Sequence, residues 1–256
     1  MCFRKKPTLP ITGNKVSLLF GINDYHGSGN DLSGCLNDID DVEKKLKRDF
    51  PEFHIRKFKD SEVTTQKFIS EIENVFNMIK LPGVLYIHYS GHGTQIPNIQ
   101  EINKYDEALY LYNGPLVDDN IWTLQQKTPE GLKVIAKFDS CFSGNMNRSI
   151  ITGTKSRFYK LPGIRIMKTP VRKFNKSASD KWIIFSGCEE EQTSSDAFFN
   201  NRANGAFTYY DLLSYNKDST YKDEIRVLKT YLPNGNFDQI PELYGNSILF
   251  ENKVLT

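Results

Sequence analysis

Short apolar runs punctuate this chain, and segments with apolar residues at every third or fourth position lie between them. The apolar runs have strand length and read as buried strands; they are Lys15–Ile22, Val84–Tyr89, Leu132–Phe138 and Trp182–Ser186. Shorter runs predict further strands at Ile55–Phe58, Ala108–Leu111, Leu116–Val117 and Ser247–Phe250.

The helical spacing is clearest after Thr64 and Thr65, where a threonine cap precedes apolar residues three and four positions apart. A second helix is predicted to start near Asn37 or Asp38 and to end at Phe50-Pro51. Later helices are expected at Ala206–Tyr215 and Asp223–Leu232. Strands that alternate with helices predict an α/β fold with a mainly parallel sheet and right-handed crossovers.

One segment breaks this regular pattern. Residues Asn145–Ser179 contain nine lysines and arginines and no aspartate or glutamate, with proline and glycine scattered among them. We interpret this segment as an exposed, mobile connection, in a chain long enough for one large domain or two small ones.

The overall composition is that of an ordinary soluble protein, with 39% hydrophobic and 25% charged residues and a net charge of +2. Its four cysteines are far apart and show no CxxC spacing, which disfavours a zinc ribbon or a disulfide framework. No apolar run approaches the roughly 18 residues of a membrane span, and the N-terminus lacks the apolar core of a signal peptide. We therefore expect a cytoplasmic protein that does not bind membranes.

Reactive side chains follow two of the predicted strands. His92 comes after Val84–Tyr89 and Cys141 comes after Leu132–Phe138, each where serine and glycine interrupt the apolar run. Functional side chains in α/β proteins lie beyond the carboxyl ends of the strands, so neighbouring strands would bring imidazole and thiol together. Such a pair performs nucleophilic catalysis, and the Gly93 and Cys141 N–H groups could form an oxyanion hole. Taken alone, Cys141 would be read as a buried core thiol.

The same motifs resemble a known family. YSGHG at Tyr89–Gly93 and DSCFSG at Asp139–Gly144 are similar to the His and Cys motifs of metacaspases, caspase-like cysteine peptidases of clan CD. The step of 49 residues from His92 to Cys141 agrees with the caspase spacing of about 50. The resemblance extends in family order over nearly the whole chain, through LSGCLNDIDD, DEALYL, LVDDNI, SGCEEEQTSSDA and GAFTYY. It implies a single domain over residues 1–256, built as a three-layer caspase-like sandwich with helices on both faces of the sheet, and a His92–Cys141 dyad.

Metacaspases cleave after arginine or lysine, through an acidic pocket for the residue before the cut (P1). The resemblance assigns this S1 pocket to Cys35, Asp38, Ser90 and Asp139. Desolvated carboxylates suit a cationic side chain, and arginine can bind them in a bidentate way. For Asp38 the alternative reading is a helix cap.

Many metacaspases require calcium, and the resemblance implies a carboxylate site at Asp106, Asp118 and Asp119. Where the family places another aspartate after the nucleophile, this chain reads Asn145-Met146-Asn147-Arg148, so the sequence leaves calcium binding open. The alternative for Asp118-Asp119 is a solvated turn. His88 and His92 share an H-x₃-H spacing but lie on a strand without a third ligand, so we read His88 as a core histidine and expect neither zinc nor an organic cofactor.

In this family the basic segment separates a large part, here 1–148, from a small part, here 180–256, and is cut by the enzyme itself. The resemblance therefore implies self-cleavage within 145–179. The candidate residues are Lys155, Arg157, Lys160, Arg165, Lys168, Arg172, Lys173 and Lys176. A nucleic-acid-binding patch is the competing reading, but the segment has few of the interleaved aromatic residues that such a patch uses.

Three functions remain in competition at this stage. The first is a monomeric cysteine endopeptidase that cleaves proteins or peptides after arginine or lysine. The second is a catalytically silent caspase-like scaffold or regulator, which the departure after Cys141 favours and the intact His92 and Cys141 disfavour. A legumain-like secreted enzyme is the third, and the lack of a signal peptide and of a disulfide pattern disfavours it.

Overall fold

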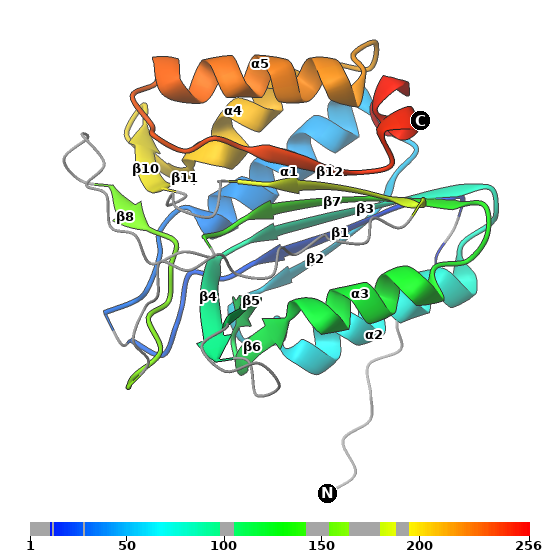
Figure 1. Ribbon diagram of the computed structural model, residues 1–256. Helices are drawn as coiled ribbons and strands as arrows, with labels where there is room; N and C mark the ends of the chain where they lie inside the picture. Colours follow the sequence, from blue (N-terminus) through cyan, green and yellow to red (C-terminus); the bar gives the residue numbers. More distant parts are fainter. Residues whose placement is uncertain are drawn as a thin grey trace, which may run out of the picture.

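A six-stranded sheet runs through the middle of the molecule (Figure 1), in the order β12-β9-β7-β3-β1-β2. The computed structural model describes residues 11, 13–27, 29–97, 105–141, 154–163, 180–187 and 195–256. The five neighbouring strands from β9 to β2 pair in parallel, and β12 pairs antiparallel with β9. The strands are β1 (Lys15–Gly21), β2 (His54–Lys59), β3 (Gly83–Ser90), β7 (Leu132–Asp139), β9 (Trp182–Ser186) and β12 (Glu242–Gly245).

Helices cover both faces of this sheet (Figure 1), as the resemblance implied. On one face lie α1 (Cys35–Asp49), α4 (Ala206–Ser214) and α5 (Tyr221–Asn234); on the other lie α2 (Thr65–Met78) and α3 (Asp118–Lys127). Because strand side chains alternate between faces, Leu18 and Phe20 of β1 pack in the core with α2, whereas Leu19 packs in the core with α1. The fold is a three-layer α/β sandwich with a mainly parallel sheet, which confirms the expected fold class.

Two small antiparallel sheets lie at one end of the central sheet. One joins β4 (His92–Pro97), β5 (Tyr105–Leu111) and β6 (Gly114–Val117); the other joins β11 (Arg202–Gly205), β10 (Ser195–Phe199) and β8 (Lys155–Ser156). Short 3₁₀ turns at Asp60–Glu62 and Ser247–Glu251 complete the secondary structure of the described residues. In this part of the chain, no helix combines the length and hydrophobicity needed to cross a membrane.

Most of the predicted elements are present near their predicted positions. The threonine cap of α2 is Thr64, whose side chain accepts the Lys67 N–H at 3.2 Å. Helix α1 begins at Cys35, two residues before Asn37, since the chain turns into the helix at Gly34.

Three elements differ from the prediction. Ser247–Phe250 is not a strand but part of a 3₁₀ turn that Asn246 caps by accepting the Ile248 N–H; the last strand is β12, a few residues earlier. Helix α3 was not expected, because Asp118-Asp119 resembles a turn, yet Ile121 and Leu124 give it a buried face. Strand β4, which begins at His92 directly after Gly91, was not predicted.

A buried charge cluster joins the sheet to α4 and α5. The Lys137 ammonium of β7 donates to both carboxylate oxygens of Asp211 at 2.9 Å and also to Glu224, and all three side chains are fully buried. The aromatic rings of Phe185 and Tyr215 lie 4.9 and 4.2 Å from the ammonium. Burial raises the pKa of Glu224 to about 8, while the two carboxylates raise the pKa of Lys137 against the opposing effect of burial.

Replacing Lys137 with methionine should strongly destabilise the protein. The substitution leaves the buried carboxyl groups of Asp211 and Glu224 without a cation, a change that costs about 3–5 kcal/mol of unfolding free energy. The matched control is Lys133→Met on the same strand, where the lysine donates to the Thr256 carbonyl at 2.6 Å near the surface; we expect a loss below about 1 kcal/mol there. Urea denaturation of both variants measures the difference, and equal losses would contradict the prediction.

Candidate active site

The carboxyl ends of β3 and β7 lie side by side. The two strands pair in parallel with Ser90 opposite Asp139, and His92 and Cys141 each follow that pair by two residues. A Cβ on Gly91 would lie 2.5 Å from the Tyr89 hydroxyl and 2.7 Å from that of Tyr25, so glycine is required at the bend between β3 and β4. The predicted adjacency of the two strands is confirmed.

Two backbone N–H groups at these strand ends bind one carbonyl oxygen. The oxygen belongs to Arg157, and it accepts from Gly93 at 2.9 Å and from Cys141 at 3.2 Å. Two donors that converge on a single carbonyl oxygen have the arrangement of an oxyanion hole. The Cys141 thiol, reduced and fully buried, belongs to the residue that supplies one of these donors.

His92 is held in one orientation by its neighbours. Its Nε2 lies 2.6 Å from the Asn30 carbonyl oxygen, which can only accept, so Nε2 carries the proton and Nδ1 is the basic nitrogen of the neutral ring. Nδ1 is buried and forms no hydrogen bond to any residue that the structure describes. The Tyr25 hydroxyl accepts the backbone N–H of His92 at 2.8 Å, and the centroids of the two rings lie 4.5 Å apart. Burial lowers the pKa of His92 to about 4, so the imidazole is neutral near pH 7.

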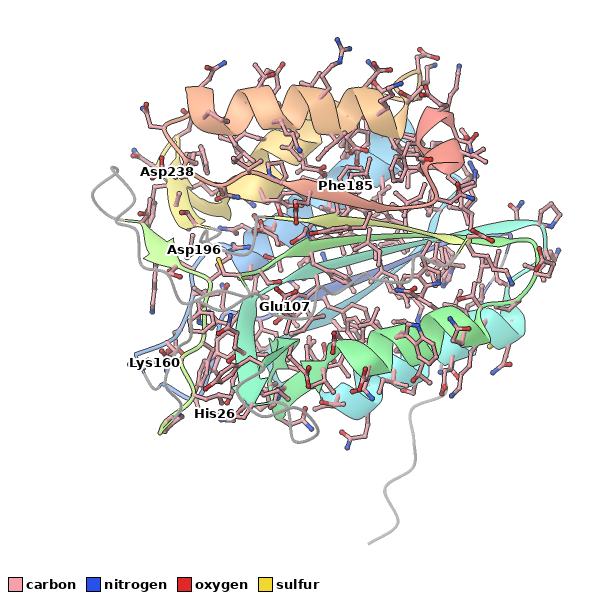
Figure 2. All side chains as sticks on the ribbon, in the orientation of Figure 1. His26, Glu107, Lys160, Phe185, Asp196 and Asp238 are labelled. Atoms are coloured by element: carbon pink, nitrogen blue, oxygen red, sulfur yellow. The ribbon has the colours of Figure 1, made fainter. Side chains whose placement is uncertain are left out.

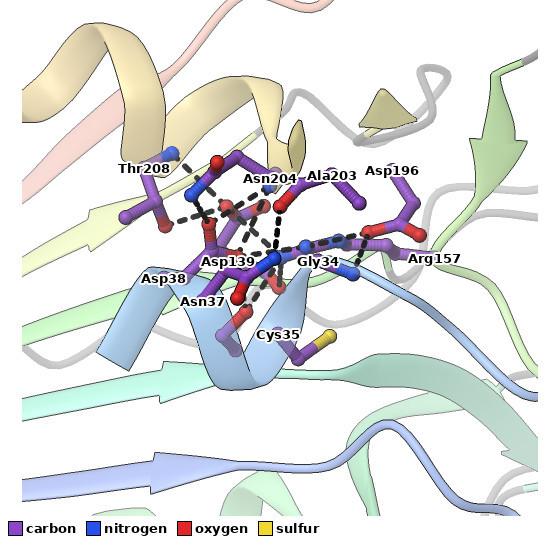
Figure 3. Close-up of polar contacts among 12 residues, drawn as sticks. Gly34, Cys35, Asn37, Asp38, Asp139, Arg157, Asp196, Ala203, Asn204 and Thr208 are labelled. Atoms are coloured by element: carbon purple, nitrogen blue, oxygen red, sulfur yellow. Dashed lines mark hydrogen bonds and ion pairs between the residues drawn. The ribbon is translucent and has the colours of Figure 1, made fainter. Parts of the chain in front are cut away.

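The guanidinium of Arg157 lies in a fully buried acidic pocket (Figure 3). Nη1 pairs with Asp139 at 3.0 Å and donates to the Ser90 hydroxyl at 2.7 Å. Nη2 pairs with Asp38 at 2.8 Å and with Asp196 at 3.0 Å. Three of the four predicted pocket residues thus contact this cation directly, from α1, β3 and β7.

Further polar groups hold the Asp38 and Asp139 carboxylates in place. Asp38 accepts the Gly205 N–H at 2.9 Å and the Asn204 side-chain amide at 2.9 Å. Asp139 accepts the Thr208 N–H at 3.0 Å and its hydroxyl at 2.6 Å. Burial and the neighbouring Asp139 raise the pKa of Asp38 to about 6, although Arg157 opposes that rise. Asp38 does not cap α1, so the helix-cap reading is wrong.

Glycine is necessary in the wall of this acidic pocket. A Cβ on Gly205 would lie 2.1 Å from a carboxylate oxygen of Asp139 and 2.4 Å from Nη1 of Arg157. The fourth predicted pocket residue, Cys35, starts α1 near Arg157 (Figure 3) and is fully buried, which raises the pKa of its thiol well above the ordinary value.

His88 belongs to the support of the acidic pocket. It is fully buried, with Nε2 3.2 Å from the Thr208 hydroxyl, and burial lowers its pKa to about 3. The expectation of a core histidine is confirmed, with the added role of contacting a residue that holds Asp139.

Asp196, Asn204 and Thr208 were missed as pocket residues by the sequence analysis. They belong to β10, β11 and α4, far along the chain from Asp38 and Asp139. Asp196 lies within the SGCEEEQTSSDA motif and Thr208 within GAFTYY, so those motifs were the available signal.

The segment that carries Arg157 is bound across the ends of β3 and β7. On one side of Arg157, Lys155–Ser156 form β8 against β10, and the Lys155 ammonium donates to the Gly29 carbonyl at 2.8 Å. Lys160 is exposed (Figure 2), as expected for the basic segment, but Arg157 is fully buried and contradicts that expectation. The five remaining cleavage candidates, Arg165, Lys168, Arg172, Lys173 and Lys176, lie outside the described residues.

The carboxylates of the predicted calcium site lie on different elements. Asp106 is on β5, and Asp118 and Asp119 begin α3, where Asp118 accepts the Asp119 N–H at 2.9 Å. Their oxygen donors suit calcium chemically, but the described residues contain no group of three His, Cys, Asp or Glu side chains placed to hold a metal ion. Residues Asn145–Arg148 are outside the described ranges, and calcium binding stays a prediction of the resemblance.

Comparison with known proteins points to one family. Residues 14–252 match the family model described as the caspase domain. The chain is 28% identical to Metacaspase-1 of Candida albicans over 91% of its own length and 65% of that protein. It is 32% identical to Metacaspase-2 of Trypanosoma brucei brucei over 94% of its own length and 76% of that protein. The chain thus spans just under two thirds of the Candida relative.

Solved structures share the fold. A Geobacter sulfurreducens protein superposes with a TM-score of 0.74 at 23% identity, covering 95% of this chain and 98% of that one. Caspase-1 of Spodoptera frugiperda gives a TM-score of 0.62 at 13% identity, covering 95% and 92%. At these low identities, the two comparisons show that the fold is shared.

Proposed function

Because the chain belongs to the caspase-domain family, with metacaspases among its relatives, we propose that it is a cysteine endopeptidase that cleaves after arginine or lysine. One observation carries the proposal: the Arg157 carbonyl oxygen accepts from Gly93 and Cys141 while its guanidinium pairs with three buried aspartates. A P1 residue of a substrate needs this same combination of contacts.

The geometry supports a direct sequence of steps. Nδ1 of His92 takes the thiol proton as the Cys141 sulfur attacks the P1 carbonyl carbon, and the Gly93 and Cys141 N–H groups stabilise the negative oxygen. The imidazolium gives its proton to the leaving amine, and a thioester to Cys141 remains. Water then attacks the thioester with His92 as base, which releases the P1 carboxylate and restores the thiol.

The acidic pocket supports a preference for arginine over lysine at P1. The two Nη atoms of Arg157 reach four partners on four different elements, whereas one ammonium cannot satisfy a set spread so widely. An aspartate at P1 would face three carboxylates and should be rejected.

Peptides that carry a fluorogenic group after P1 test the activity. We expect turnover with arginine at P1, about tenfold lower kcat/KM with lysine, and none with aspartate. Cys141→Ala should abolish all turnover, and assays with calcium or with EGTA measure the predicted calcium dependence. Absence of turnover under every condition would contradict the peptidase and favour a caspase-like scaffold, whereas cleavage after aspartate would contradict only the pocket assignment.

The contacts of Arg157 favour self-cleavage of the bond between Arg157 and Phe158. Of the candidate residues that the structure describes, Arg157 combines the oxyanion-hole contacts with the acidic pocket, while Lys155 and Lys160 are exposed. Because the segment is bound by its own chain, its effective concentration at the cleft is high and cleavage should be intramolecular.

Incubation of the full chain should therefore yield fragments 1–157 and 158–256, identified by intact mass. Arg157→Ala should stop this cut and Arg157→Lys should slow it about tenfold, whereas the exposed control Lys160→Ala should cut at the wild-type rate. The first-order rate should not change over a hundredfold range of protein concentration. A cut elsewhere in Arg157→Ala at the wild-type rate would overturn the assignment.

Substrate binding should weaken as Asp38 takes up a proton. Burial raises its pKa to about 6 even beside Arg157, and protonation removes one of the charges that attract a P1 arginine. Pairs of peptides with arginine or the uncharged citrulline at P1 isolate this effect, because the titration of His92 and Cys141 cancels in their ratio. The ratio of kcat/KM, arginine over citrulline, should fall about tenfold between pH 7.5 and 5. A ratio that stays constant over this range would exclude Asp38 as the titrating group.

A further inference from the structure

The chain beyond Arg157 is also fixed by the enzyme. The Tyr159 N–H donates to the Gly93 carbonyl at 2.8 Å, and the Thr94 hydroxyl donates to the Tyr159 carbonyl at 2.7 Å. The Gly93 N–H also donates to the Arg157 carbonyl, so three hydrogen bonds hold this stretch along β4. The other edge of β4 pairs with β5. In the bound segment these bonds involve backbone atoms only, so a substrate of almost any sequence could form them.

The Tyr159 ring makes the side-chain contact on this side of the cut. It stacks on Tyr110 of β5, with centroids 3.7 Å apart and planes at 11°. The rings of His92 and Tyr25 lie 5.8 and 6.1 Å away. The segment therefore places an aromatic ring on a group of aromatic side chains directly beside the candidate dyad.

The backbone of Tyr110 is held in place without help from the bound segment. Its carbonyl accepts the Tyr89 hydroxyl at 2.9 Å, and it lies opposite His92 in the β4–β5 pairing. Because the backbone that carries this ring is already held, less conformational entropy is lost when an aromatic side chain stacks on it.

We infer that Tyr110, with Tyr25 and His92, forms a subsite for an aromatic residue at the second position after the cut (P2′), so that the protein selects substrates on both sides of the bond. This inference rests on the proposed peptidase function and extends it: the acidic pocket binds the P1 side chain, and the Tyr110 ring binds the P2′ side chain. The alternative is that Tyr159 only packs against its own chain and that the enzyme selects free substrates by their P1 side chain alone.

Internally quenched peptides based on the bound sequence test the subsite. Self-cleaved protein is assayed with KSRFYK, KSRFLK and KSRFAK, which differ only at P2′. We expect kcat/KM to be highest for tyrosine and about tenfold lower for alanine, with leucine between them. In Tyr110→Leu the tyrosine-to-alanine ratio should fall to about 2, and in Tyr110→Phe, which keeps the ring, it should stay near the wild-type ratio. The matched control is Tyr231→Leu on α5, which should leave the ratio unchanged.

A short peptide, KSR joined to a coumarin, separates the two levels of the proposal because it has no residue at P2′. If wild type does not hydrolyse it, the peptidase function itself fails. If wild type hydrolyses it but cleaves the three longer peptides at equal rates, the subsite is overturned and the function stands. A ratio in Tyr110→Leu equal to that of wild type would overturn the role of Tyr110.

Discussion

The pairing of one buried arginine with three buried aspartates is the interaction on which the arrangement of the site depends. Three desolvated carboxylates within reach of one another are unstable unless a cation neutralises them. Arg157 supplies that cation, and in doing so it joins α1, β3, β7 and β10 around one point. The N–H and hydroxyl donors of Gly205, Asn204 and Thr208 also contact these carboxylates and offset part of the repulsion. A pocket built in this way requires a positive charge but does not depend on which chain provides it.

The parts of the site that depend on local pattern were predictable from the sequence. His92 and Cys141 follow apolar runs of strand length, and parallel strands that succeed one another along the chain tend to pair, so their adjacency followed from the order of elements. Asp139 lies two residues before Cys141 on the same strand, which fixed its place in the pocket. The same reasoning identified most of the helices and the mainly parallel sheet, whereas the three-layer arrangement was implied by the family resemblance.

The remaining features depend on contacts between distant parts of the chain. Nothing local to Arg157 distinguishes it from the other basic residues of its segment; its burial arises from carboxylates that lie 18, 39 and 119 residues away. Asp196 was not identified for the same reason. Helix α3 was missed because aspartate is favoured both in turns and at helix starts. The final strand was misplaced because Ser247–Phe250 is apolar enough for a strand but is capped into a 3₁₀ turn by Asn246.

The pairing of β8 with β10 bears on which proteins the proposed peptidase could cleave. The residues before Arg157 are bound as an added strand, and those after it are bound along β4, so the ligand is extended on both sides. A helix or a tight turn cannot make those backbone contacts. Within a folded protein, an arginine would have to lie in a stretch that is already unstructured or that unfolds locally at modest cost. The local stability of the target, as well as its sequence, would then decide where it is cut.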